Sequence, residues 1–143
     1  MFTSSEFKLP HKLQYKKDLS EDSEFNMTLR SFMDEEDMIC SEITVRDQKY
    51  KNGDLIVIEV KDSDNLVVGI IQTLLVRNKK IYFVTRKIDA MRVWLRYFQT
   101  TNSNSTYSFV ESNQLPDYKP LIRRGRSDKF LFMLHHFISF EYS

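Results

Sequence analysis

From Tyr50 to Arg86 the chain reads YKNGDLIVIEVKDSDNLVVGIIQTLLVRNKKIYFVTR. Short polar breaks separate three apolar runs, which occupy residues 55–60, 66–76 and 81–84. Apolar runs of this length between polar breaks are typical of strands joined by hairpins. The stretch therefore predicts an antiparallel meander.

Three positions in this stretch predict how the meander turns and bends. Gly53 lies where a tight turn often needs a positive φ angle. Gly69 interrupts an apolar run and predicts a bulge or sharp bend, the device by which small sheets curl. Asn78 begins a predicted hairpin, because asparagine tolerates the left-handed conformation. The predicted fold class is mainly β with minor α: a curled antiparallel sheet or small open barrel, SH3/Tudor-like, with a short N-terminal helix.

The chain divides into a predicted acidic arm at residues 1–38 and a predicted β-rich domain at residues 39–143. The arm is predicted to be weakly ordered apart from one short helix, whose apolar face is formed by Phe25, Leu29, Phe32 and Met33. Asp22 or Ser23 is placed to cap this helix. We expect the helix to dock on the sheet or to be ordered only within a larger protein. The acidic run 34–37 is typical of a solvated surface.

The segments on either side of the meander contain further predicted strands, turns and loops. Residues 39–46 alternate apolar and polar side chains, as in a half-exposed strand. Near residue 90 a helical spacing competes with a strand-like alternation, and the helical spacing is favoured for a single turn. The predicted elements are a helical turn at 89–93, a strand to about residue 100, a loop at 101–105, a strand at 106–111, a turn at 117–119, a loop at 123–128 and a strand at 130–140.

The composition indicates one domain with a core, because the chain has 143 residues of which 41% are hydrophobic. The net charge is +1, yet residues 1–49 carry seven Lys and Arg against eleven Asp and Glu, whereas residues 50–143 carry fourteen against nine. A polyanion would therefore meet the second part first. Cys40 is the only cysteine, so no intrachain disulfide is possible. With no visible secretory signal and no apolar window of ~18 residues, we expect an intracellular protein, nuclear or cytoplasmic, without a membrane partner.

Three motifs carry a resemblance to a known family: Tyr50-Lys51-x-Gly53-Asp54, LPDYKPL at 115–121 and LHHFI at 134–138. In order and spacing they resemble the C-terminal β-rich domain of uncharacterised invertebrate proteins, many of them associated with mobile elements. Those relatives often carry zinc-finger-like or helical modules upstream, so the resemblance implies a fragment or a reduced copy, with no activity assigned to the domain. The aromatic-x-x-Gly-Asp turn is also similar to that of bromo-adjacent homology and Tudor-like chromatin modules.

The sharpest candidate for a partner contact is the basic tetrad Arg123-Arg124-Gly125-Arg126. Guanidinium groups around a flexible glycine can bind phosphates in a bidentate manner. Other basic residues extend this candidate surface, namely Lys79, Lys80, Arg86, Lys87, Arg92 and Arg96. Aromatic rings lie between them in the sequence, as on platforms for single-stranded nucleic acid. The alternative is a solvated loop with ordinary sheet charges.

Four aromatic residues offer a second candidate site, a cage for a methylated lysine: Tyr50, Tyr82, Trp94 and Tyr97. Such a cage surrounds the cation with several ring faces. The alternative is that these rings pack in the core.

Catalytic and metal sites are weakly indicated. Cys40 could act as a nucleophile with His11, His135 or His136 as the base, but a buried strand cysteine is the simpler interpretation. Adjacent histidines on a strand point to opposite faces, so His135 and His136 do not share one metal ion. The separated carboxylates that a metal-dependent nuclease could use are Asp54, Glu59 and Asp89. No cofactor and no metal are expected.

The sequence therefore predicts a non-enzymatic interaction module that binds a protein partner or nucleic acid. Nucleic-acid binding through the loop at 123–126 is the first alternative, and a chromatin-reader-like aromatic cage is the second. A hydrolytic enzyme is a further alternative, which requires Cys40, a histidine and a carboxylate to meet in a pocket. A protein partner would be indicated by an exposed apolar patch or an unpaired edge strand.

Overall fold

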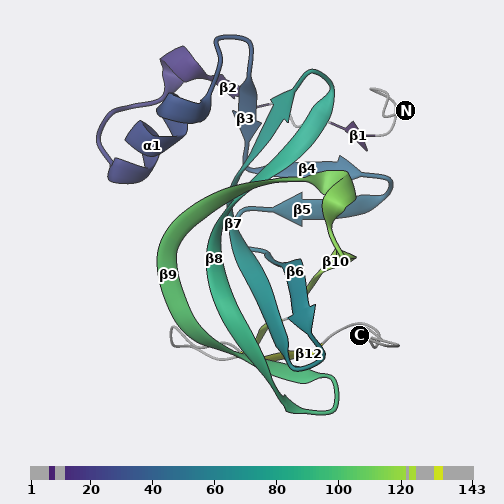
Figure 1. Ribbon diagram of the computed structural model, residues 1–143. Coiled ribbons are helices and arrows are strands. Elements are labelled where there is room, and N and C mark those ends of the chain that lie inside the picture. Colours follow the sequence, from purple (N-terminus) through teal and green to yellow (C-terminus); the bar gives the residue numbers. More distant parts are fainter. Residues whose placement is uncertain (1–6, 9–11, 122, 125–130, 134–143) are drawn as a thin grey trace.

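Four consecutive strands, each hydrogen-bonded to the next, form the centre of the structure (Figure 1). They are β6 (Leu55–Asp62), β7 (Asn65–Arg77), β8 (Lys80–Trp94) and β9 (Tyr97–Glu111), all paired antiparallel. Asn78 and Lys79, between β7 and β8, have φ angles of 51° and 64°. Left-handed φ angles at both central positions are the geometry of a tight hairpin turn. The predicted meander and its Asn78–Lys79 hairpin are confirmed.

The structure is a computed structural model that describes residues 7–8, 12–121, 123–124 and 131–133. Its remaining elements are short: β1 (Phe7–Lys8), β2 (Gln14–Tyr15), η2 (Lys16–Asp18), α1 (Glu24–Phe32), β3 (Met38–Cys40), β4 (Glu42–Val45), β5 (Gln48–Lys51), η3 (Ser112–Gln114), β10 (Asp117–Leu121), β11 (Arg123–Arg124) and β12 (Leu131–Met133). The larger sheet has the order β10-β6-β7-β8-β9-β12-β11, and β3 joins it beside β7. A smaller sheet has the order β1-β4-β5. The mainly β class is confirmed.

The chain itself links the two ends of the larger sheet. β10 pairs with β6 and ends at Leu121, whereas β11 begins at Arg123 and pairs with β12. The sheet therefore curls until its outer strands are one residue apart in the chain, without a closed ring of hydrogen bonds among the described strands. Residues 117–119, predicted as a turn, lie instead in β10. The flanking prolines are tolerated there because β10 is an edge strand, which can lack a backbone donor.

Shifts of register bend the long strands. One lies in β6 between Val57 and Glu59, and another lies in β7 between Ile71 and Thr73. Further shifts interrupt the pairing of β8 with β9. Such bulges strengthen the twist and curl a sheet.

Gly69 is not one of these bulges, so that prediction is wrong. It pairs regularly with Ile56 on one side and Lys87 on the other. A Cβ atom at Gly69 would lie 2.5 Å from Ile58 Cδ1 and 2.7 Å from Thr85 Cβ. Side chains from both neighbouring strands close over this position, so only a hydrogen atom fits. Gly53, by contrast, has the predicted positive φ, at 92°.

The predicted N-terminal helix is confirmed as α1. Ser23 is its N-cap, since the Ser23 hydroxyl accepts a hydrogen bond of 3.0 Å from the Asn26 amide. Leu29 and Met33 are buried against one face of β7 and β8, where they pack with Leu75 and Val84. The helix α1 is therefore packed against the sheet through its apolar face. Figure 1 shows α1 beside β3.

Two further apolar clusters lie on opposite faces of the curled sheet, because the adjacent β6 residues Ile56 and Val57 belong to different clusters. One lies beneath the β4–β5 hairpin and includes Ile43, Tyr50, Ile56, Leu74, Ile81 and Phe83. The other lies toward the opposite end of the long strands and includes Leu55, Val57, Leu66, Val68, Ile88 and Phe98. Side chains of β6 and β7 contribute to both, so these strands hold the two clusters together.

Two predictions around β8 and β9 are wrong. Residues 89–93 form no helical turn but complete β8, and residues 101–105 form no loop but lie within β9. Long continuous pairing between the two strands overrides the local preferences of both segments. The strand predicted at 106–111 is the last part of β9. In the strand predicted at 130–140, residues 131–133 form β12. In the loop predicted at 123–128, residues 123–124 form the strand β11 instead. The other positions of both segments lie outside the described residues.

Candidate interaction surfaces

The turn between β8 and β9 carries a group of exposed apolar side chains. We call this group the β8–β9 tip; its members and their exposed fractions are Met91 (50%), Val93 (52%), Trp94 (65%) and Leu95 (55%). Leu95 has a φ angle of 47°, a left-handed conformation that is uncommon for leucine. Large apolar residues at neighbouring exposed positions are unusual, whereas single exposed ones are ordinary. The tip is therefore a candidate contact surface.

Two rings at the tip hold each other in place. Trp94 lies opposite Tyr97 across the two strands, and their ring centroids are 5.9 Å apart with an angle of 15° between the planes. Stacked cross-strand rings stabilise a hairpin end. Because the two rings are nearly parallel, the pair presents a flat exposed indole and does not surround a cation as a cage would.

Arg92 fixes the tip to the neighbouring β6–β7 turn. Its Nε donates to the Ser63 carbonyl at 3.0 Å and to Asp64 Oδ1 at 3.1 Å. Its guanidinium carbon lies 4.8 Å from the centroid of the Phe98 ring. Its backbone amide also donates to the Asp64 carbonyl at 2.8 Å. These contacts join the base of the tip to the β6–β7 turn. They give Arg92 a structural role.

The four rings considered for a cage lie in three different places. Tyr50 is 3% exposed and packs on Phe83, with centroids 4.8 Å apart. Tyr82 packs near Phe109, beside α1, with centroids 6.1 Å apart. Along β8, the 12 residues from Tyr82 to Trp94 span roughly 40 Å. The structure therefore brings only Trp94 and Tyr97 together and forms no four-ring cage.

The basic candidates are spread along β8: Arg86 and Lys87 lie in the middle of the strand, and the others lie at its two ends. Lys79 and Lys80 lie at the β7–β8 turn, where Lys80 Nζ is 3.7 Å from Glu111 Oε1. Arg92 and Arg96 lie at the other end, beside the β8–β9 turn.

Backbone register brings the described part of the tetrad to this second end. Arg92 lies opposite Phe98, Phe98 opposite Phe132, and Phe132 opposite Arg123. Arg123 is thus three strands across from Arg92, roughly 14 Å at the usual strand spacing. Arg124 is the next residue of β11, and Arg126 lies outside the described residues.

The thiol of Cys40 is buried in a cluster of apolar side chains. Burial raises its pKa to about 11, so the thiol is protonated at neutral pH. His11, His135 and His136 lie outside the described residues. Within the described ranges, no group of three or more His, Cys, Asp or Glu is arranged to hold a metal ion. The carboxylates Asp54 and Asp89 have local partners, namely the Lys51 amide at 3.0 Å and Lys61 at 3.8 Å.

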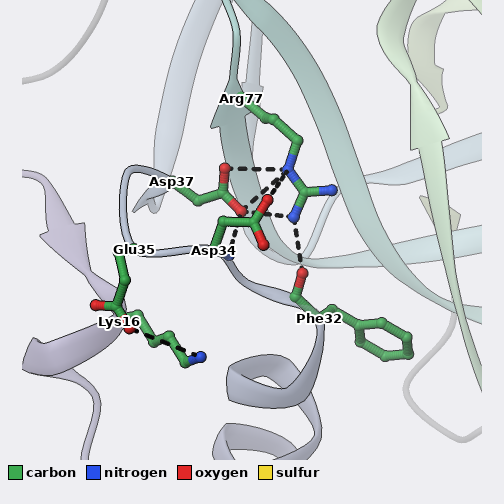
Figure 2. Close-up of polar contacts among 6 residues, drawn as sticks. All are labelled: Lys16, Phe32, Asp34, Glu35, Asp37 and Arg77. Carbon is green, nitrogen blue, oxygen red and sulfur yellow. Dashed lines mark hydrogen bonds and ion pairs between the residues drawn. The ribbon is translucent and has the colours of Figure 1, made fainter.

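The ion pair between Asp37 and Arg77 was not predicted from the sequence (Figure 2). Asp37 is 2% exposed, although the run 34–37 was expected to be solvated. Arg77 Nε lies 3.0 Å from each carboxylate oxygen, and the Asp34 amide donates to Oδ2 at 2.7 Å. Burial alone would raise the pKa of Asp37, but these hydrogen bonds outweigh it and hold the pKa below its usual value. The pair fastens the α1–β3 connection to the end of β7.

Two adjoining hollows flank η3. The strand β9, which precedes η3, runs from the β8–β9 turn to the opposite end of the long strands (Figure 1). One, of about 440 Å³, lies between η3 and the β7–β8 turn. The other, of about 310 Å³, lies between η3 and the β4–β5 hairpin. Ser112 and Asn113 line both hollows. We call the two hollows together the η3 groove.

Comparison with family models, with curated proteins and with solved structures gives no match. Across the part of the chain that the structure describes, no helix is long and apolar enough to cross a membrane.

Proposed function

We propose that the protein is a non-enzymatic interaction module that binds a protein partner through the β8–β9 tip. The observation that carries the proposal is the exposure of Met91, Val93, Trp94 and Leu95 at one turn, each at least half exposed. An exposed apolar patch of this kind is typical of a contact surface for another protein.

The chemistry of the tip suits a protein contact. Tryptophan is among the residues whose burial contributes most to protein interfaces. The stack of Trp94 on Tyr97 and the bonds of Arg92 order the tip before binding. A pre-ordered surface loses less conformational entropy when it binds. The partner would offer an apolar pocket for the Trp94 indole.

The finer features of the fold belong to the same proposal. We take the curled sheet, with β10 and β11 linking its two ends, as an SH3/Tudor-like arrangement. The resemblance to mobile-element-associated domains and a nuclear or cytoplasmic location are part of this proposal. The motif that begins at Tyr50 supports it, because Gly53 makes the tight turn that precedes β6.

Quantitative affinity capture with a tip variant tests the proposal. The variant is Trp94→Ser with Leu95→Asn, since asparagine tolerates the left-handed φ of that position. The matched control is Met27→Ser, which removes a side chain of similar exposure, 56%, from α1. We expect one set of proteins to be retained by the wild type and the control and lost by the tip variant. Equal recovery by all three proteins would refute the proposal.

Nucleic-acid binding is the second candidate, and the backbone register favours it. Arg123 falls in one cross-strand row with Arg92, at the end of the sheet where Trp94 is exposed. The exposed Trp94 indole can stack on a base of a single strand. This candidate predicts binding to a labelled single-stranded oligonucleotide that weakens steeply with salt. Reversal of charge at Arg123, Arg124 and Arg126 should then abolish binding, while Lys17→Glu should not.

A further inference from the structure

The η3 groove has properties that the β8–β9 tip lacks. It lies at the other end of the long strands, between the β7–β8 turn and the β4–β5 hairpin (Figure 1). Its two hollows, about 440 Å³ and 310 Å³, each fall within the ~300–1,000 Å³ of ligand sites in proteins. Ser112 and Asn113 line both hollows, so the two hollows adjoin at η3.

The polar groups of the groove are available to a ligand. The side chains of Ser112 and Asn113 form no hydrogen bond with any residue that the structure describes, and Lys79 likewise forms no ion pair there. Lys79 belongs to a hairpin turn whose two central φ angles are both left-handed. Hydroxyl, amide and ammonium groups thus line the first hollow.

The charges of the groove select the kind of anion. Lys80 lies beside Glu111, which lines the same hollow and is itself negative. Lys79, which has no ion pair among the described residues, lies next to a carboxylate, and Arg46 lines the second hollow. Cations set apart in this way suit a ligand with single, spaced negative charges. A nucleic-acid backbone carries closely spaced phosphates and needs a longer track of cations. The charge pattern therefore fits an acidic peptide better than a polynucleotide.

We propose that the η3 groove binds a short acidic peptide segment of a partner protein. A carboxylate of the peptide pairs with Lys79, and its backbone amides form hydrogen bonds with the side chains of Ser112 and Asn113. An apolar side chain of the peptide enters the second hollow, which Val45 and Tyr50 line. This site is separate from the tip, so the protein can hold two segments at once.

Fluorescence anisotropy with a labelled hexapeptide of alternating Glu and Leu tests the site on the full chain. We expect saturable binding, with no comparable binding of the peptide in which Gln replaces Glu. Lys79→Glu should weaken binding by at least ~10-fold, because the change places a negative charge beside the peptide carboxylates. Lys17→Glu is the matched control: it makes the same charge change at an exposed lysine on η2, and should leave affinity within about twofold.

The remaining outcomes are also decisive. Trp94→Ser should leave peptide binding unchanged, because Trp94 does not line the groove. The groove proposal can therefore fail while the tip proposal holds, and the reverse is also possible. Lys79 is exposed and Lys79→Glu should unfold at the same urea concentration as the wild type, which separates lost binding from lost folding. The proposal is overturned if the Gln peptide binds equally well, if both lysine variants weaken binding alike, or if a single-stranded oligonucleotide displaces the peptide.

Discussion

The guanidinium of Arg77 forms hydrogen bonds with the carboxylate of Asp37, whose two oxygens each lie 3.0 Å from Nε (Figure 2). A terminal nitrogen of the same group donates to the Phe32 carbonyl at 2.7 Å, at the last residue of α1. One side chain of β7 thus holds both the C-terminal end of the helix and the segment that leads into β3. Docking of α1 on the sheet depends on this contact as well as on the apolar cluster beneath the helix.

Asp37→Asn should lower the free energy of unfolding by about 2–3 kcal/mol, because it leaves a half-buried guanidinium without its counter-charge. Urea unfolding followed by far-UV circular dichroism measures the loss. The matched control is Asp34→Asn, whose side chain is 78% exposed and lies 3.9 Å from Arg77. That change should cost less than ~0.5 kcal/mol. Equal losses for the two variants would mean that burial of the ion pair is unimportant.

Acid should remove the contribution of Asp37. Its folded-state pKa is lowered, so its contribution is complete above the unfolded-state pKa of about 3.9 and is lost as the pH falls through the lower folded-state value. The difference in unfolding free energy between wild type and Asp37→Asn should therefore be constant from pH 7 to about pH 5 and shrink below that. Urea titrations at stepped pH measure this difference. A difference that persists undiminished at pH 2 would contradict the assignment.

Gly69→Ala should destabilise the fold by about 1–3 kcal/mol, the usual cost of forcing extra atoms into a packed site. The added methyl would meet Thr85 Cβ, part of a side chain that is fully buried, and cannot move away freely. Thermal and urea unfolding measure the effect. Gly53→Ala is the comparison: it meets no atom within 4 Å, so any cost there comes from the φ angle of 92°. A neutral Gly69→Ala would show that β6 and β8 do not close over this position.

Cys40 should resist alkylation in the folded protein. Its pKa of about 11 leaves very little thiolate at pH 8, whereas an unfolded cysteine has a pKa near 8.5. Iodoacetamide labelling followed by mass spectrometry should be slower in the folded state by at least ~100-fold, because thiolate is the reactive species. Labelling at equal rates with and without urea would place the thiol at the surface.

Local signals in the sequence predicted the local geometry. Gly53 and Asn78 were recognised because positive φ angles favour particular residue types, and Ser23 was one of two candidate caps, with Asp22, that side-chain chemistry suggested. The turn at Leu95 carries no such residue, and its left-handed φ is imposed by the pairing of Trp94 with Tyr97. Without that signal, the apolar spacing before it resembled a helical turn.

Features that depend on distant partners were not predictable. Asp37 belongs to a run of four acidic residues, and its burial depends on Arg77, forty residues later in the chain. The polar stretch 101–105 resembles a loop, yet pairing with β8 makes it part of β9. The β8–β9 tip and the η3 groove exist only once the long strands are aligned. The aromatic residues could be recognised as candidates, but not their distribution over three places.

Fluorescence of Trp94, the only tryptophan of the chain, reports directly on the β8–β9 tip. In the free protein the exposed indole should emit as a solvated ring and be readily quenched by iodide. On titration with a purified protein retained by the wild type and lost by the tip variant, we predict a saturable blue shift, protection from iodide and little change in affinity with added salt. Emission that is already blue-shifted and protected in the free protein, or that stays unchanged at saturation, would contradict the proposal that this tip binds the partner.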